Sequence, residues 1–119
     1  MSDLAGLRVL VVEDEPIVAM CLEDLLVDLG IVVVGPAATL AEGLSEAQGS
    51  GLDAAILDIN LGETTSYPIA ALLAARSVPV VFATGYGRID PPEAIRAEVI
   101  GKPYSTGDII GALARAMVG

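Results

Sequence analysis

The stretch LRVLVVEDEP, residues 7–16, decides the fold, because a short apolar run is followed at once by acidic residues and a proline. The run Leu7–Val12 is rich in valine and leucine and predicts a buried strand. Proline is tolerated in the first turn of a helix, and glycine commonly ends one. We therefore expect a helix from about Glu15 to Leu29, with Pro16 in its first turn and Gly30 after its end.

The same alternation of strand and helix continues along the chain, which favours a parallel sheet with helices on both faces. The expected fold is α/β, a flavodoxin-like doubly wound sheet of five βα units with strand order 2-1-3-4-5 and a shortened fourth helix; the pattern alone does not fix that order. The remaining strands are expected at Ile31–Val34, Ala54–Leu57, Val78–Ala83 and Val99–Ile100, and the remaining helices after Thr39, at Tyr67–Arg76, Glu93–Ala97 and from Ser105 to Met117.

Composition limits the function classes. The chain has 119 residues, the size of one domain, and we expect a single domain over residues 1–119. Its net charge of −10 argues against direct binding of nucleic acid or anionic membranes. No signal peptide or bilayer-spanning stretch is visible, and the single cysteine, Cys21, fits a reducing compartment and core packing, so we expect a cytoplasmic protein.

Polar side chains follow four of the five expected strands. Strand carboxyl ends meet along one edge of an open parallel sheet, where ligand crevices form, so these side chains should converge. Clustered carboxylates with a nearby ammonium and hydroxyl suit a divalent cation and a phosphoryl group, and Mg²⁺ prefers such oxygen ligands. The candidate site residues are Glu13, Asp14, Asp58, Asn60, Thr84 and Lys102, the last being the only lysine of the chain.

With these motifs in order at the strand ends, the chain resembles the receiver domains of two-component response regulators. The resemblance implies that Asp58 accepts a phosphoryl group from a histidine kinase or phosphotransfer protein, with Mg²⁺ as cofactor. It implies that Asp14, Asp58 and the backbone carbonyl of Asn60 bind the metal, and that Glu13 acts through a metal-bound water. Lys102 and Thr84 would bind the phosphoryl group. The run Phe82-Ala83-Thr84-Gly85 resembles a subgroup that often occurs as stand-alone receivers.

Three features depart from the usual receiver pattern, and the first is the short segment between Thr84 and Lys102, which shortens the fourth helix. The aromatic switch residue expected three positions before the lysine is replaced by Val99, and Tyr86 or Tyr104 is a candidate substitute. The proline expected four residues after the phosphoacceptor is replaced by Gly62. In addition, the Lys102–Pro103 bond is a candidate cis peptide that would aim the ammonium.

Output is expected through protein–protein interaction or as a phosphate sink, with an unidentified downstream protein and a possible homodimer. Kinase specificity is expected from the first helix and the loop after the fifth strand, around Ile17, Ala19, Met20, Pro103 and Tyr104. Two alternatives stay open. One is a pseudo-receiver that only binds partners, and the other is an Mg²⁺-dependent aspartyl phosphohydrolase. The second is disfavoured because Asn60 stands where such enzymes carry an acidic proton donor, so we expect no dedicated metabolic enzyme.

Overall fold

The computed structural model describes residues 4–85, 97–102 and 104–118. Its centre is a five-stranded parallel sheet in the order β2-β1-β3-β6-β7, which is the predicted order of the five main strands. The strands are β1 (Arg8–Val12), β2 (Val32–Ala37), β3 (Ala54–Asp58), β6 (Val80–Thr84) and β7 (Ala97–Gly101), and the helices are α1 (Pro16–Asp28), α2 (Leu40–Ala47), α3 (Tyr67–Ala75) and α4 (Thr106–Val118).

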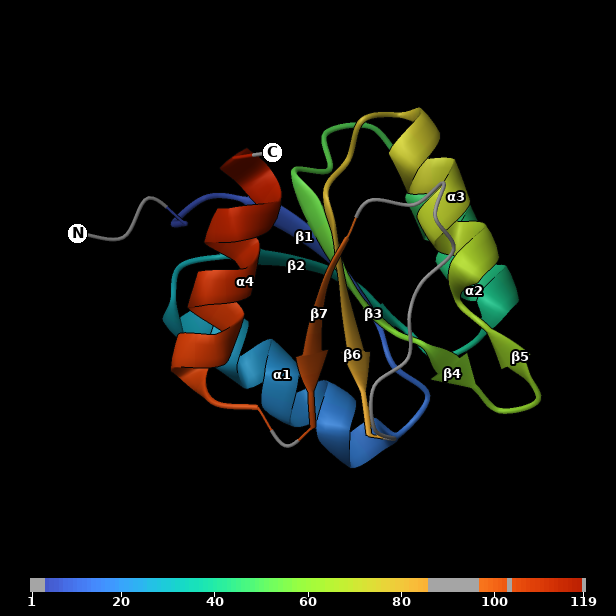
Figure 1. Cartoon of the computed structure of the whole chain (residues 1–119), viewed down its shortest axis with the longest axis horizontal. Coiled ribbons are helices and arrows are strands. Elements are labelled where there is room, and N and C mark those ends of the chain that lie inside the picture. Colours follow the sequence, from blue (N-terminus) through green and yellow to red (C-terminus); the bar gives the residue numbers. More distant parts are fainter. Residues whose placement is uncertain (1–3, 86–96, 103, 119) are drawn as a thin grey trace.

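Helices cover both faces of the sheet, as Figure 1 shows: α1 and α4 lie on one face, and α2 and α3 on the other. Alternate residues of each central strand point to opposite faces. In β1, Val9 and Val11 pack toward α1 and α4, whereas Leu10 and Val12 pack toward α2 and α3. Apolar side chains on both faces explain why these strands read as continuous hydrophobic runs.

The helix starts follow local sequence signals. Pro16 is the first residue of α1. At α2, the Thr39 hydroxyl accepts from the Glu42 backbone N–H at 3.1 Å, and the Glu42 carboxylate accepts from the Ala38 N–H at 2.8 Å. At α4, Ser105 and Asp108 form the predicted reciprocal capping box, with bonds of 2.9 and 3.1 Å.

Two predicted boundaries are wrong. Strand two does not stop before Gly35-Pro36 but continues through both residues to Ala37. The sheet tolerates the proline because β2 is an edge strand, where the missing N–H removes no hydrogen bond to a neighbouring strand. The register between β2 and β1 shifts at this point, between Leu10 and Val12. Ala97 belongs to β7 rather than to a short helix, because β7 pairs with β6 over its full length. The rest of the predicted fourth helix, residues 93–96, lies outside the described residues.

A small antiparallel hairpin follows β3 and was not predicted. Its strands are β4 (Asn60–Leu61) and β5 (Thr64–Thr65), with Gly62 at a φ of +69° in the turn. Ser66 precedes α3 as predicted, but its side chain does not cap the helix; the Thr65 hydroxyl accepts from the Tyr67 N–H instead, at 3.4 Å. The hairpin therefore connects the end of β3 directly to α3.

Candidate functional site

The carboxyl edge of the sheet brings together side chains that are far apart in the sequence. Asp58 is the last residue of β3, at the centre of the sheet. Glu13 and Asp14 follow β1 on one side of it, and Lys102 follows β7, two strands away on the other side. The doubly wound topology thus places an acidic pair, a central carboxylate and an ammonium at one edge.

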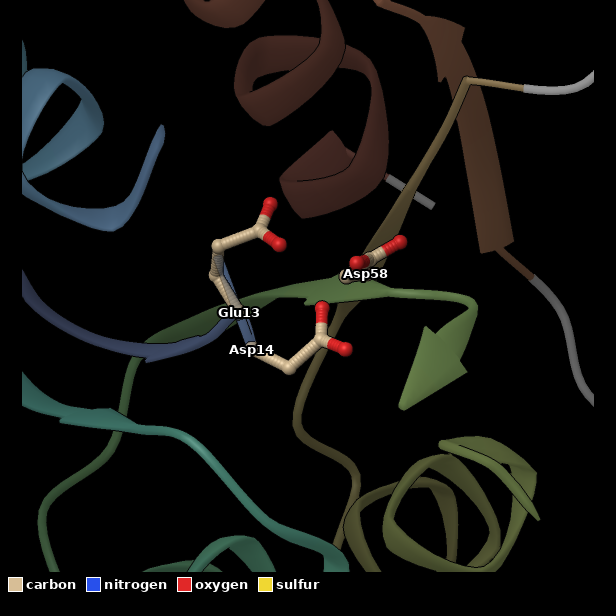
Figure 2. A group of neighbouring side chains, drawn as sticks. All are labelled: Glu13, Asp14 and Asp58. Carbon is tan, nitrogen blue, oxygen red and sulfur yellow. The ribbon is translucent and has the colours of Figure 1, made fainter. Parts of the chain in front are cut away.

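Three carboxylates form the centre of this site. Glu13, Asp14 and Asp58 each offer one oxygen, and these three oxygens lie within 4.8 Å of one another. Figure 2 shows that the side chains of Glu13 and Asp14 leave the chain in different directions, yet both carboxylates turn toward Asp58. Glu13 and Asp58 are buried, at 4% and 6% exposure, whereas Asp14 is more accessible. Such crowded acids repel one another unless a cation or a proton neutralises them.

Lys102 supplies part of that neutralisation. Its Nζ lies 2.6 Å from Glu13 Oε1 and 3.4 Å from Asp58 Oδ2. The other Glu13 oxygen, Oε2, accepts from the Glu15 backbone N–H at 3.2 Å. The Lys102 backbone N–H donates to the Thr84 carbonyl at 2.8 Å, which fixes the start of the lysine at the end of β6. Lys102 is therefore held both at its backbone and at its ammonium, and the ammonium lies closer to Glu13 than to Asp58.

The electrostatics of the site shift three ionisable groups. Burial, followed by the hydrogen bond and charge of Glu13, raises the pKa of Asp58 from 3.8 to about 7, although Lys102 acts in the opposite direction. Burial alone would lower the pKa of Lys102, but the bond to Glu13 and the charges of Asp58 and Glu13 outweigh it and raise that pKa. Burial and the Glu13 charge also raise the pKa of Tyr104. A cation added next to Asp58 would therefore lower the pKa of this carboxyl.

A polar cavity of about 310 Å³ opens beside Asp58. Among the sequence-predicted residues, Asp14, Asp58, Asn60 and Lys102 line it. Glu15, Gly62 and Gly85 line it as well and were not predicted as site residues. The sequence carried a signal for Gly85, because a glycine close to a strand end lets the backbone approach a ligand closely. The cavity is large enough for a hydrated cation and a phosphoryl group together.

Of the two remaining predicted residues at this edge of the sheet, Asn60 lines the cavity and Thr84 does not. Thr84 is the buried last residue of β6, next to Ala83, which pairs with Asp58. Asn60 begins β4, two residues after Asp58. Tyr86 and Pro103, the candidate switch and the candidate cis peptide partner, lie outside the described residues. Val99 lies on β7, opposite Phe82, and is 39% exposed.

An apolar cavity of about 500 Å³ adjoins the polar one, and Lys102 and Gly85 line both. Its other lining residues include Tyr104, which also packs against the core, and Cys21. The prediction that Cys21 packs in the core is wrong: the residue is exposed, because Ala19, Leu22 and Leu26 form the buried side of α1. For the same reason Ala19 cannot take part in the expected kinase-specificity surface, whereas Ile17 and Met20, exposed at 73% and 56%, remain accessible.

Comparisons with known proteins agree with this geometry. The family model of the response regulator receiver domain matches residues 9–114. The phyllosphere-induced regulator PhyR of Methylorubrum extorquens is 33% identical over 98% of this chain and 45% of its own length. The chain spans about half the length of the curated relatives it matches, the other being the transcriptional regulatory protein PdtaR of Mycobacterium tuberculosis. These relatives are regulators, and the phosphohydrolase alternative finds no support among them.

Solved structures show the same fold. SdrG from Sphingomonas melonis Fr1, a solution structure, is 43% identical, covers all of both chains and superposes with a TM-score of 0.82. The receiver domain of the sensor histidine kinase PA1611 from Pseudomonas aeruginosa PAO1 has the same TM-score over 97% of this chain and 100% of its own, at 24% identity. That crystal structure has a magnesium ion coordinated in its active-site cleft. Within the part of the chain that the structure describes, no helix has the length and apolar character needed to cross a bilayer.

Proposed function

Because this chain belongs to the family of response regulator receiver domains, we propose that it is a phosphoacceptor in a two-component phosphorelay. It would act as a single receiver domain. Asp58 would take the phosphoryl group from a histidine kinase or a phosphotransfer protein. It is not a dedicated metabolic enzyme, as its named relatives are regulators. The proposed subgroup is the stand-alone type with the Phe82–Gly85 motif.

One observation carries this proposal. Asp58 ends the central strand β3, lines the polar cavity and has the Lys102 ammonium 3.4 Å from its Oδ2. A carboxylate at the rim of a cavity, with a cation beside it, can reach an incoming phosphorus while the charge on the phosphoryl oxygens is neutralised. Phosphoryl transfer needs mainly such positioning and charge neutralisation.

The proposed reaction uses Asp58 as the nucleophile. One carboxylate oxygen attacks the phosphorus of a phosphohistidine, a new O–P bond forms, and the P–N bond breaks, so that the imidazole leaves with the electron pair. Asp58 must be ionised for this attack, and the pKa of about 7 leaves only part of the population in that state near neutral pH. Lys102 stabilises the ionised form and lies close enough to pair with a phosphoryl oxygen.

The donor set fits Mg²⁺ as the cofactor. Hard carboxylate oxygens within 4.8 Å of one another, at a polar cavity with room for water, are what this ion prefers. We assign the metal to Asp14, Asp58 and the backbone carbonyl of Asn60, with Glu13 acting through a metal-bound water. When bound, the ion would neutralise the carboxylates and the phosphoryl oxygens. Its positive charge next to Asp58 would also lower the pKa of that carboxyl.

Readout would begin at the end of β6. Thr84 is one residue beyond the Asp58 pairing partner, and its carbonyl already holds the Lys102 backbone. A rotation of the Thr84 side chain toward a phosphoryl oxygen would couple phosphorylation of Asp58 to the segment that follows β6. Tyr104 and Tyr86 remain the proposed aromatic substitutes for Val99. The output would be protein binding or a phosphate sink in the cytoplasm, with Ile17 and Met20 of α1 on the proposed kinase-facing surface.

Intact mass after incubation with acetyl phosphate and Mg²⁺ tests the proposal. The wild-type chain should gain the mass of one phosphoryl group, and Asp58→Asn should gain none. EDTA should abolish the adduct on the wild type. An adduct that persists on Asp58→Asn would refute Asp58 as the acceptor. If neither protein is labelled while a control receiver is, the partner-binding pseudo-receiver becomes the better description.

A further inference from the structure

The start of α3 carries a polar atom that the fold leaves without a partner. Among the described residues, the Ser66 hydroxyl is the only buried side-chain oxygen or nitrogen that makes no hydrogen bond. Ser66 is fully buried and occupies the N-cap position of α3. A buried hydroxyl without a partner costs free energy, and native structures rarely keep one unless another conformation uses it.

A matching donor lies in the first turn of the same helix. An N-cap serine normally accepts from the backbone N–H two or three residues further on, and because residue 68 is a proline, the candidate is the N–H of Ile69. Ile69 is fully buried, and first-turn N–H groups have no acceptor within their own helix. The bond does not form because Ser66 has a ψ of 5°, whereas Thr39, which does cap α2, is extended with a ψ of 163°.

A neighbouring hydroxyl takes the place of this cap. Thr65 Oγ1 accepts from the Tyr67 N–H at 3.4 Å, which is longer than an ordinary hydrogen bond. The Ser66 N–H donates to the Ile59 carbonyl at 2.9 Å, and the Ile59 N–H donates to the Ala83 carbonyl of β6 at 3.1 Å. The ψ torsion of Ser66 therefore lies between a hairpin that is bonded to the sheet and a helix with a weak cap.

The hairpin reaches the polar cavity, and Figure 1 shows it at the start of α3. Asn60 of β4 and Gly62 of the turn line the cavity, whereas α3 is fixed in the core by three fully buried side chains. A rotation at Ser66 therefore moves the hairpin more than the helix. An Asn60 carbonyl that moves toward Asp14 and Asp58 meets negative charge, so this movement is unfavourable until a cation is present.

We infer that Ser66 is a hinge at which α3 exchanges its N-terminal cap. In a second conformation, Ser66 Oγ accepts from the Ile69 N–H in place of the Thr65 cap, and the hairpin carries Asn60 further into the cavity. A cation favours this conformation because it attracts the Asn60 carbonyl, so cation binding and capping by Ser66 are linked. Ser66 acts only through the hairpin and is a positioning residue. The inference rests on the proposed metal site of the phosphoacceptor.

Backbone amide NMR follows the cap directly. Addition of Mg²⁺ to the wild type should move the Ile69 amide proton downfield and slow its exchange with solvent, because this N–H gains an acceptor. In Ser66→Ala the Ile69 signal should stay in place, even at Mg²⁺ concentrations that saturate the variant. An Ile69 signal that moves equally in both proteins, or in neither, would overturn the inference. The same spectra check that each variant is folded.

Stability and affinity together separate the hinge from an ordinary cap. In EDTA, Ser66→Ala should resist urea as well as the wild type does, because the lost hydroxyl has no partner. Calorimetry should nevertheless show Mg²⁺ binding about three- to tenfold weaker, since the capped conformation loses its hydrogen bond. Thr39→Ala is the matched control: its hydroxyl already caps α2, at 3.1 Å, so this variant should lose stability and keep its Mg²⁺ affinity. Unchanged Mg²⁺ affinity in Ser66→Ala would refute the hinge.

Thr65→Val gives the opposite test. This substitution removes the cap of the described conformation, so the variant should be less stable in EDTA and bind Mg²⁺ about twofold more tightly. Weaker Mg²⁺ binding by Thr65→Val would contradict the exchange of caps. A wild type that binds Mg²⁺ but gains no phosphoryl adduct would refute the proposed function and leave the hinge standing. A wild type that binds no Mg²⁺ would refute the metal site and the linkage together.

Discussion

Replacing Asp58 by asparagine is expected to stabilise the protein in the absence of divalent cations, and the gain should grow with pH. Asp58 is buried beside Glu13 and Asp14, with one ammonium for three carboxylates. Burial and Glu13 raise the pKa of Asp58 from 3.8 to about 7. Asparagine has nearly the same shape but no charge, so the variant escapes the cost of ionising this position.

The sign and size follow from proton linkage. A carboxyl whose pKa is higher in the folded than in the unfolded state holds its proton more tightly when folded, so its stabilising contribution is complete below about pH 3.8 and is lost as the pH rises through about 7. At about 1.36 kcal/mol per pKa unit, the whole shift corresponds to about 4 kcal/mol. Between about pH 5 and about pH 8, the free energy of unfolding of the wild type should fall by roughly 2.5 kcal/mol relative to Asp58→Asn.

Urea unfolding followed by circular dichroism, in EDTA and at several pH values, measures this difference. Only its change with pH matters, because any packing effect of the amide is the same at every pH. Asp24→Asn on the exposed side of α1 is the control and should parallel the wild type. Saturating Mg²⁺ should restore the wild type at high pH and leave Asp58→Asn almost unchanged. A difference between the variant and the wild type that is constant across this pH range would refute the electrostatic reasoning.

Three further predictions concern the pH profile, the metal and the edge strand. At low Mg²⁺, acetyl phosphate labelling measured by intact mass should speed up as the pH rises through about 7, because the nucleophile is ionised Asp58; saturating Mg²⁺ should move that midpoint down, and a rate independent of pH would contradict the assignment. Asp14→Asn should abolish the Mg²⁺-dependent rise in thermal stability without preventing folding; a rise of wild-type size would remove Asp14 from the metal site. Gly35→Ala should cost about 2 kcal/mol or more in urea unfolding, because the new Cβ would meet backbone atoms at 2.8 and 3.0 Å at a φ of +98°. Gly6→Ala, at a φ of +87° with nothing within 4 Å, should cost about 1 kcal/mol, and equal losses would mean that backbone strain alone explains both.

Most of the fold could be predicted because the sheet is buried on both faces. Strands such as β3 and β6 read as apolar runs that end in one polar residue, so both their existence and their type are clear from the sequence. The extension of β2 through Pro36 could not be predicted in this way. Whether a proline ends a strand depends on whether its missing N–H would have met a neighbouring strand, and that depends on the position of β2 at the edge.

The hairpin after β3 was missed for a related reason. Its strands have two residues each, too few for a periodic pattern to emerge, and its closure depends on Ser66, whose backbone N–H donates to the Ile59 carbonyl at 2.9 Å. The face of Cys21 was also misjudged. Helical spacing placed it with Val18 and Leu22, but a core side that covers only part of α1 leaves one flank open, and Cys21 lies on that flank.

The site residues could be placed at one edge from the order of strands alone, but their pairing could not. The residues alone make Glu13 and Asp14 one acidic pair, adjacent and chemically alike, and only the resemblance to receiver domains gives them different roles. Consecutive residues at a strand end point in different directions, so one carboxylate is turned toward Lys102 and the other toward the cavity. This division gives the two acids different expected responses to substitution. Replacing Glu13 by glutamine should release the Lys102 ammonium as well as remove one carboxylate from the cluster, whereas replacing Asp14 by asparagine should leave the ammonium in place, so two acids that look alike in the sequence should respond differently to the loss of their charge.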